Sequence, residues 1–222
     1  MYSYNRITEC KPKSIERRGT IYRNEGQNRM KDRSKQLQAR KKAIQEDILR
    51  YGGDILNSSA MQRAFTQKHH TLSTVGAHSM RVATRSLAIC HALKKLHIQT
   101  DIPSVVTGSL CHDLGILGRD EKYRSSRECS RQHPLDSVEI ANALTGGVTD
   151  KTADIISRHM WPVGKAKPPN SLEAAIVSAA DKIATVEDFV KEYEEKRPGL
   201  RGVVREIRVN KKEGATWNRK KK

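Results

Sequence analysis

Residues 74–96 read TVGAHSMRVATRSLAICHALKKL, and this stretch carries the clearest helical pattern in the chain. Val75, Val82 and Ile89 recur at the spacing that places apolar side chains on one face of an α-helix. Thr74 stands immediately before the pattern, at a position where a hydroxyl group caps a helix start. The stretch therefore predicts a long amphipathic helix with one buried face.

The rest of the central chain shows helical periodicity and no convincing strand alternation. Asp101 is a predicted helix cap, Pro103 suits the first turn, and Gly115 is a predicted C′ glycine at the end of that helix. A polar loop is expected over 118–132. The other predicted helices cover about 43–65 with a break at Tyr51-Gly52-Gly53, Pro134 to Leu144, 150 to His159, and Ser171 to Glu194. We therefore expect an all-α fold, a helical bundle.

Positive charge is concentrated at the two ends of the chain. The 222 residues suit one domain with short extensions, and the net charge is +17. Residues 1–42 hold 13 Lys and Arg against 4 Asp and Glu, residues 196–222 hold 11 against 2, and residues 43–195 are near neutral. The ends are too poor in apolar residues to offset their ordering entropy. We predict a basic, largely disordered extension over 1–42 with a helix from 31, a helical domain over 43–195, and a basic tail over 196–222.

Such basic ends are usually solvated charge blocks, and contact with nucleic acid is the alternative interpretation. The four cysteines form no C-x-x-C pair, which favours reduced thiols and a cytoplasmic location over a disulfide scaffold. Residues 1–18 lack the apolar segment of a secretory signal, and no apolar run reaches the roughly 18 residues of a membrane span. No membrane partner is expected.

Four polar residues fall among the apolar positions of the predicted helices, namely His78, Asp113, His159 and Asp181. His112 directly precedes Asp113. A single buried histidine is usually a hydrogen-bonded core residue, and a single buried aspartate usually caps a helix or pairs with arginine. Three histidines and two aspartates on several helices instead resemble the metal sites that helical bundles build from facing side chains.

The order His78, His112-Asp113, Asp181 resembles the H…HD…D pattern of the HD superfamily of metal-dependent phosphohydrolases. The matching segments read GAHSMRVA over 76–83, LCHDLG over 110–115 and SAADKI over 178–183. The resemblance covers about residues 65–190 and implies an HD-domain helical bundle.

Two further histidines match the dinuclear branch of that superfamily: His133 in HPLDSVEIA and His159 in IISRHMWP. The stretch from 159 to 181 looks like the uncharacterised clostridial-type HD hydrolases. Met160 and Ile116 depart from the motifs of the cyclic-di-GMP phosphodiesterases, and residues 114–132 lack the Glu-Asp pair of the alarmone hydrolases. Neither of those two activities is expected.

The resemblance implies one or two divalent ions, drawn from Mn, Fe, Co, Ni, Zn and Mg. The ligands would be His78, His112, Asp113, His133, His159 and Asp181, with Asp113 and His112 also catalytic. It further implies hydrolysis of a phosphomonoester or phosphodiester by metal-activated water, with a nucleotide as the expected substrate. Arg81, Lys182 and His70 are predicted to contact that substrate. The alternative is a catalytically weak module that binds nucleotides or nucleic acid through its basic tails.

Overall fold

The computed structural model describes residues 15–70, 73–163 and 166–196, with side chains from residue 30 onward except at 70 and 194. The chain divides into two compact units, Met1–Ala43 and Ile44–Lys222. The predictions for residues 1–14 and 197–222 lie outside the described residues.

The first helix is longer than its sequence pattern predicts. α1 (Ile15–Asn57) begins well before the expected start at 31 and continues through Tyr51-Gly52-Gly53, where a break was expected. That prediction was wrong because Gly52 serves packing: a Cβ there would stand 2.4 Å from Leu110 Cδ1 and 3.0 Å from Val106 Cγ1. The glycine allows the helix to approach its neighbour closely, at a modest cost in helix propensity.

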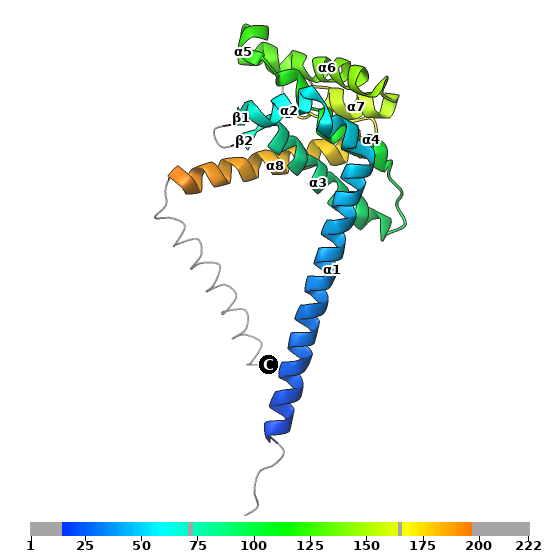
Figure 1. Cartoon of the computed structure of the whole chain (residues 1–222), viewed down its shortest axis with the longest axis vertical. Coiled ribbons are helices and arrows are strands. Elements are labelled where there is room, and N and C mark those ends of the chain that lie inside the picture. The colour runs from blue at the N-terminus through cyan, green and yellow to red at the C-terminus, as the bar shows by residue number, and fades with distance from the viewer. Residues whose placement is uncertain (1–14, 71–72, 164–165, 197–222) are drawn as a thin grey trace, which may run out of the picture. The chain divides into compact units, whose positions relative to one another are not determined.

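The second unit is built almost entirely of helices, which confirms the all-α prediction (Figure 1). Its further elements are α2 (Ser59–Thr66), β1 (Lys68–His70), β2 (Ser73–Thr74), α3 (Val75–Lys94), α4 (Ile102–Cys111), the 3-10 turn η1 (Leu114–Ile116), α5 (Arg119–Lys122), α6 (Ser126–Thr145), α7 (Asp150–Arg158) and α8 (Leu172–Lys196). The short antiparallel β1–β2 hairpin was not expected, because two strands of two or three residues carry no readable alternation.

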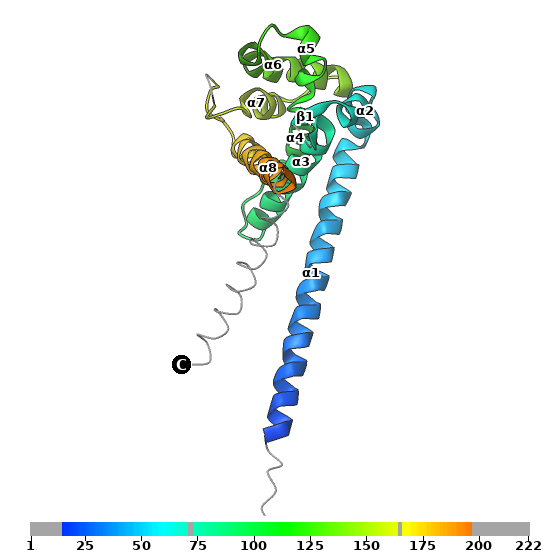
Figure 2. The same cartoon turned by 90° about the vertical axis from the view of Figure 1, so that its left-hand side faces the viewer.

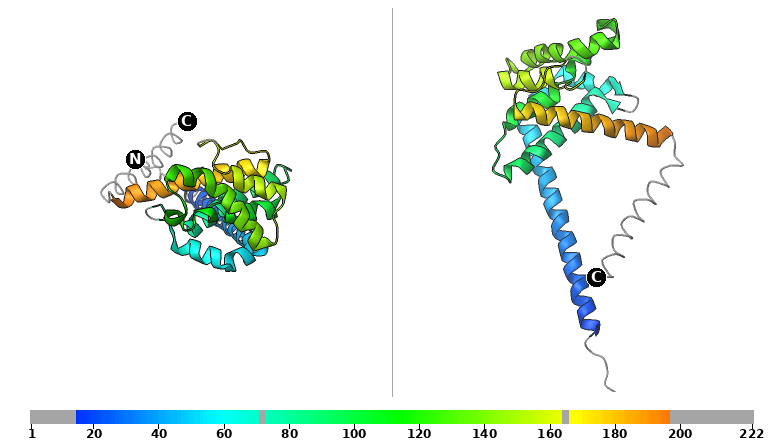
Figure 3. Two further views of the ribbon diagram at one scale, coloured as in Figure 1. Left: turned by 90° about the horizontal axis from the view of Figure 1, so that it is seen from above. Right: turned by 180° about the vertical axis from the view of Figure 1, so that it is seen from behind.

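The core lies between α3, α4 and the helices packed on them. α3 contacts α4 and α8, α4 contacts α7, and α6 contacts α7 and η1 (Figures 2 and 3). Val75, Val82, Leu87, Leu110 and Ile155 are completely buried in this core. The apolar stripe of residues 74–96 therefore faces inward, as its spacing predicts.

The predicted helix starts are confirmed by side-chain caps. Thr74 accepts a hydrogen bond from the N–H of Ala77, and Asp101 accepts one from the N–H of Ser104. Thr149 and Ser171 cap α7 and α8 in the same way. Among the described residues, no helix combines the length and apolar character that a membrane span requires.

The start of α6 was predicted wrongly. The helix begins at Ser126, inside the expected polar loop, and Pro134 lies within it. Ser125 accepts from the N–H of Glu128, and the Glu128 carboxylate accepts from the N–H of Arg124, so two reciprocal bonds similar to a capping box stabilise the helix start. His133 is consequently a mid-helix residue.

Gly115 does not have the C′ role that its sequence position suggests. It lies in η1 and has no positive φ. A Cβ at 115 would stand 2.2 Å from the carbonyl oxygen of His133, so the glycine lets this turn touch the main chain of α6.

Candidate metal centre

The six predicted ligands come together at one buried place. α3 supplies His78, His112 is the C-cap residue that directly follows α4, and Asp113 comes next, before η1. The other three are His133 in α6, His159 at the end of α7 and Asp181 in α8. All six side chains are buried. Because α4 ends at this point, adjacent His112 and Asp113 can both turn toward the same cluster.

The two carboxylate oxygens of Asp113 face two different sets of imidazoles. Asp113 Oδ2 lies 3.2 Å from His112 Nε2 and 3.8 Å from His78 Nε2. Asp113 Oδ1 lies 3.3 Å from His133 Nε2 and 3.4 Å from His159 Nε2. A carboxylate in this position has the geometry of a bridge between two neighbouring ligand sets.

Asp181 completes the set on the Oδ2 side. Its Oδ1 lies 2.9 Å from His78 Nε2 and 3.8 Å from His112 Nε2. Ligand atoms bound at about 2.0–2.2 Å around one ion stand about 3.0–3.5 Å from each other. Two of the four separations in this set, 2.9 and 3.2 Å, agree with that range, and the other two, both 3.8 Å, are slightly longer.

Hydrogen bonds on the outer side of the rings fix which nitrogen faces the cluster. Nδ1 donates to a main-chain carbonyl in three rings: His112 to Ser109 at 2.8 Å, His133 to Cys129 at 2.8 Å and His159 to Ile156 at 2.7 Å. Since Nδ1 carries the proton, Nε2 presents its lone pair inward in the neutral rings. His112 Nε2 is buried without a hydrogen-bond partner in the described part of the chain. A bound cation would accept the lone pair of this nitrogen.

The electrostatics of the cluster also suit a cation. Burial alone would raise the pKa of Asp113, but the neighbouring imidazoles, His112 first, hold it well below its usual range. The pKa of Asp181 is lowered as well, against its burial and chiefly by the hydrogen bond from His78. Both carboxylates are therefore ionised and can only accept or ligate.

The two histidines on the Oδ1 side differ in their protonation. Burial opposes the charged form of His133, yet the hydrogen bonds with Asp113 and Cys129 raise its pKa to about 10. Burial lowers the pKa of His159. In the absence of an ion, His133 therefore carries the extra proton of this pair.

The structure adds two residues to the six predicted ligands. His69 in β1 places Nε2 2.8 Å from Asp113 Oδ2, and its ring stacks on His78 with centroids 4.5 Å apart. Asp188, two turns after Asp181 on α8, is buried with Oδ2 3.5 Å from His78 Nδ1. The spacing of Asp181 and Asp188 on one face of α8 was the available signal for the second residue.

The three predicted substrate residues have different surroundings. Lys182 donates from Nζ to Asp181 Oδ2 and to the carbonyl of His159, each at 2.7 Å. Arg81 donates to Asp188 at 2.5 Å and to Ser73 at 2.6 Å, so it supports the carboxylate behind His78. The side chain of His70 lies outside the described residues.

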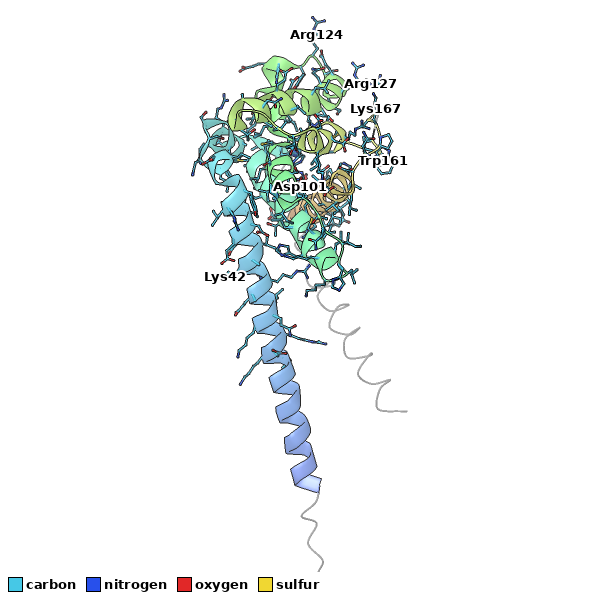
Figure 4. The ribbon with its side chains drawn as sticks, turned by 90° about the vertical axis from the view of Figure 1, so that its right-hand side faces the viewer. Lys42, Asp101, Arg124, Arg127, Trp161 and Lys167 are labelled. Atoms are coloured by element: carbon cyan, nitrogen blue, oxygen red, sulfur yellow. The ribbon has the colours of Figure 1, made fainter. Side chains whose placement is uncertain are left out.

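A pocket of about 600 Å³ opens onto the cluster. It is lined by Asp113, His133, His159 and Asp181, and by Lys182. The described lining also includes polar and apolar neighbours from η1, α5, α6 and the segment after α7: Ile116, Arg119, Tyr123, Ser126, Ser130, Met160 and Val163. Figure 4 labels Trp161, half exposed on the same segment after α7.

Comparison with known proteins agrees with this geometry. A family model described as the HD domain matches residues 75–186, half of the chain, and the chain belongs to the HD-domain family. Proteins of this family are generally metal-dependent hydrolases. No curated protein and no solved structure matches the chain. The predicted family is therefore confirmed, whereas the clostridial-type branch stays a prediction.

Proposed function

We propose that this protein is a metal-dependent phosphohydrolase that cleaves a phosphomonoester or phosphodiester, with a nucleotide as its substrate and the cytoplasm as its location. The observation that carries the proposal is the position of Asp113, whose two oxygens face separate imidazole sets. That arrangement provides ligands for two ions that share one carboxylate.

In this proposal one ion is held by His78, His112, Asp113 and Asp181. A second is held by Asp113 with His133 and His159. Three groups of donors have ligand atoms within 4.8 Å of one another: His78, His112 and Asp181; His112, Asp113 and His159; and His78 and Asp113 with the half-buried His69. Divalent first-row ions suit such imidazole and carboxylate ligands, and they supply a hydroxide nucleophile and polarise the phosphoryl oxygen.

The protein groups around the cluster orient the reactants. The carboxylate of Asp113 would accept a proton from the attacking water. His112 is held beside Asp113 by its hydrogen bond to the carbonyl of Ser109. Lys182 holds Asp181 in place and presents a positive charge at the pocket wall. A pocket of about 600 Å³ accommodates a nucleotide-sized ligand.

A metal and substrate screen tests the proposal. Chelator-stripped protein would be reloaded separately with Mn²⁺, Fe²⁺, Co²⁺, Ni²⁺, Zn²⁺ and Mg²⁺, and assayed against nucleotides and p-nitrophenyl esters. We expect hydrolysis with at least one ion and none in the stripped protein. Equal rates with and without metal, or no hydrolysis of any phosphoester, would contradict the proposal. Asp54→Asn is a matched control because Asp54 is exposed on α1.

A second candidate function, binding of nucleic acid, is favoured by the surface of α1. Side chains 30–42 are exposed or nearly so, and six of them are Lys or Arg, including Lys42 (Figure 4). Nucleic-acid binding through these charges would weaken steeply with salt. Replacing Arg33, Lys35, Arg40, Lys41 and Lys42 by Gln in the full chain should reduce both the affinity and its salt dependence. Unchanged binding would remove α1 from this function.

A further inference from the structure

The β1–β2 hairpin brings a fifth imidazole to the cluster from outside the segment that the HD family matches. That match begins at residue 75, and His69 lies in β1 (Lys68–His70). Its Nε2 is 2.8 Å from Asp113 Oδ2, and its ring lies nearly parallel to that of His78, at an interplanar angle of 11°. His69 is thus in direct contact with the residue at the centre of the site.

The hairpin is fastened to the turn that follows Asp113. The side-chain amide of Gln67 donates to the carbonyl of Ile116 at 2.8 Å and accepts from the N–H of Gly118 at 2.8 Å. The Gln67 carbonyl also accepts from the N–H of Val75, 3.0 Å away, where α3 begins. These three bonds hold the strand that carries His69 in a defined position relative to Asp113.

His69 differs from the ligand imidazoles in its access to the pocket. His78 and His112 are completely buried behind the cluster, whereas the His69 side chain is 11% exposed and lines the pocket. His133 and His159 also line it, but their Nε2 atoms face each other and Asp113 Oδ1. Among the described imidazoles on the Oδ2 side, His69 is the one that lines the pocket.

The hydrogen bond to Asp113 shows which nitrogen of His69 carries a proton. An ionised carboxylate only accepts, so His69 Nε2 is the donor in this contact. His78, His112, Asp113 and Asp181 already provide four ligand atoms on the Oδ2 side, so His69 is an additional imidazole beside that set. Because the His69 side chain also lines the pocket, its Nε2 hydrogen is close enough to be donated to a phosphoryl oxygen of a ligand bound there.

We propose that His69 is a substrate-contacting residue, which donates its Nε2 hydrogen to an oxygen of the phosphoryl group held over the cluster. This inference rests on the proposed phosphohydrolase function and assigns to the hairpin a role in binding the phosphate. Before substrate arrives, the same N–H is satisfied by Asp113.

The test measures metal and phosphate binding separately. Wild type, His69→Ala and His69→Gln would be loaded with Mn²⁺, and metal content and the affinity for inorganic phosphate would be measured by elemental analysis and calorimetry. We expect equal metal content in all three and phosphate binding at least about tenfold weaker in His69→Ala. Because the Gln amide can also donate at this reach, His69→Gln should recover part of the affinity. Exposed His97, replaced by Asn to suit its positive φ, is the histidine control.

Two results would overturn the role of His69 while leaving the proposed function intact. Loss of Mn²⁺ from His69→Ala would make His69 a ligand, and an unchanged affinity for phosphate would remove it from substrate binding. If wild-type protein binds neither Mn²⁺ nor phosphate, the phosphohydrolase proposal fails, and the inference about His69 fails with it. Thermal unfolding of each variant verifies that the hairpin change leaves the fold intact.

Discussion

His133 Nε2 and His159 Nε2 face each other across 3.1 Å, while each ring donates its Nδ1 hydrogen to a main-chain carbonyl. Two neutral imidazoles in this arrangement would direct lone pairs at one another. A proton on His133, whose pKa is raised to about 10, removes that conflict in the ion-free protein. A metal ion between the two nitrogens and Asp113 Oδ1 would remove it in the same way.

Metal binding should therefore displace a proton from His133. At neutral pH that proton is present, since the pKa of His133 lies above the pH, and it must leave before Nε2 can ligate. We expect the apparent affinity for Zn²⁺ or Mn²⁺ at this position to rise about tenfold per pH unit for each displaced proton, and to level off near pH 10. Calorimetry in buffers of different ionisation enthalpy measures the released protons. A metal affinity independent of pH between 6 and 9 would contradict this interpretation.

The number of bound ions should be two. Elemental analysis of the wild type should give two equivalents, and the His133→Ala/His159→Ala variant should retain one, because the other four ligands remain. One equivalent in both proteins would instead assign these two histidines to substrate binding. The variant also removes the close Nε2 pair, so its metal affinity should depend less on pH.

Asp113→Ala should abolish hydrolysis while the helical fold survives. The residue serves both ligand sets in the proposed site, so the loss should reach at least the roughly 10²–10⁴-fold typical of a single acid–base group. Circular dichroism would verify the fold, and Asp54→Asn is the control. Lys182→Met and Met160→Leu should cost less, because neither residue is a ligand in this proposal. A fully active Asp113→Ala protein would refute the assignment.

Two adjacent glycines of α1 should respond in opposite ways to alanine. A Cβ at Gly52 would overlap buried Leu110, so Gly52→Ala should lower the free energy of unfolding by about 1–3 kcal/mol. A Cβ at Gly53 meets nothing within 4 Å, so Gly53→Ala should raise it by about 0.5–1 kcal/mol through helix propensity. Urea unfolding of both variants measures the difference. Destabilisation of equal size at both positions would show that the contact with Leu110 is unimportant.

The sequence identified the cluster better than it identified the groups around it. His78 and Asp181 were recognisable because a polar residue on an apolar helical stripe needs a partner, and the structure brings both of them to Asp113. Arg81 follows His78 by one turn, so it was expected to face substrate. Arg81 instead pairs with Asp188. Whether its side chain turns toward the pocket or toward Asp188 depends on tertiary packing, which helical periodicity does not reveal.

The predicted start of α6 was wrong because two local signals competed. Pro134 is typical of a first helical turn, yet the capping bonds of Ser125 and Glu128 start α6 earlier. The contact of His69 with Asp113 is a long-range one: it depends on a hairpin with two residue pairs and on the amide of Gln67, which bonds across 49 positions of sequence.

Gly115 has a consequence for which ions the centre accepts. Its N–H donates to Ser137 at 2.8 Å, and its α-carbon touches the main chain at His133 so closely that no side chain fits. The main-chain spacing between η1, which follows Asp113, and α6, which carries His133, is therefore set by direct contact, and this limits how far the ligand atoms of these two residues can separate. A cavity of fixed width discriminates by ionic radius. We expect it to favour ions with bonds of about 2.0–2.2 Å over Ca²⁺, which needs about 2.3–2.6 Å and more oxygen ligands.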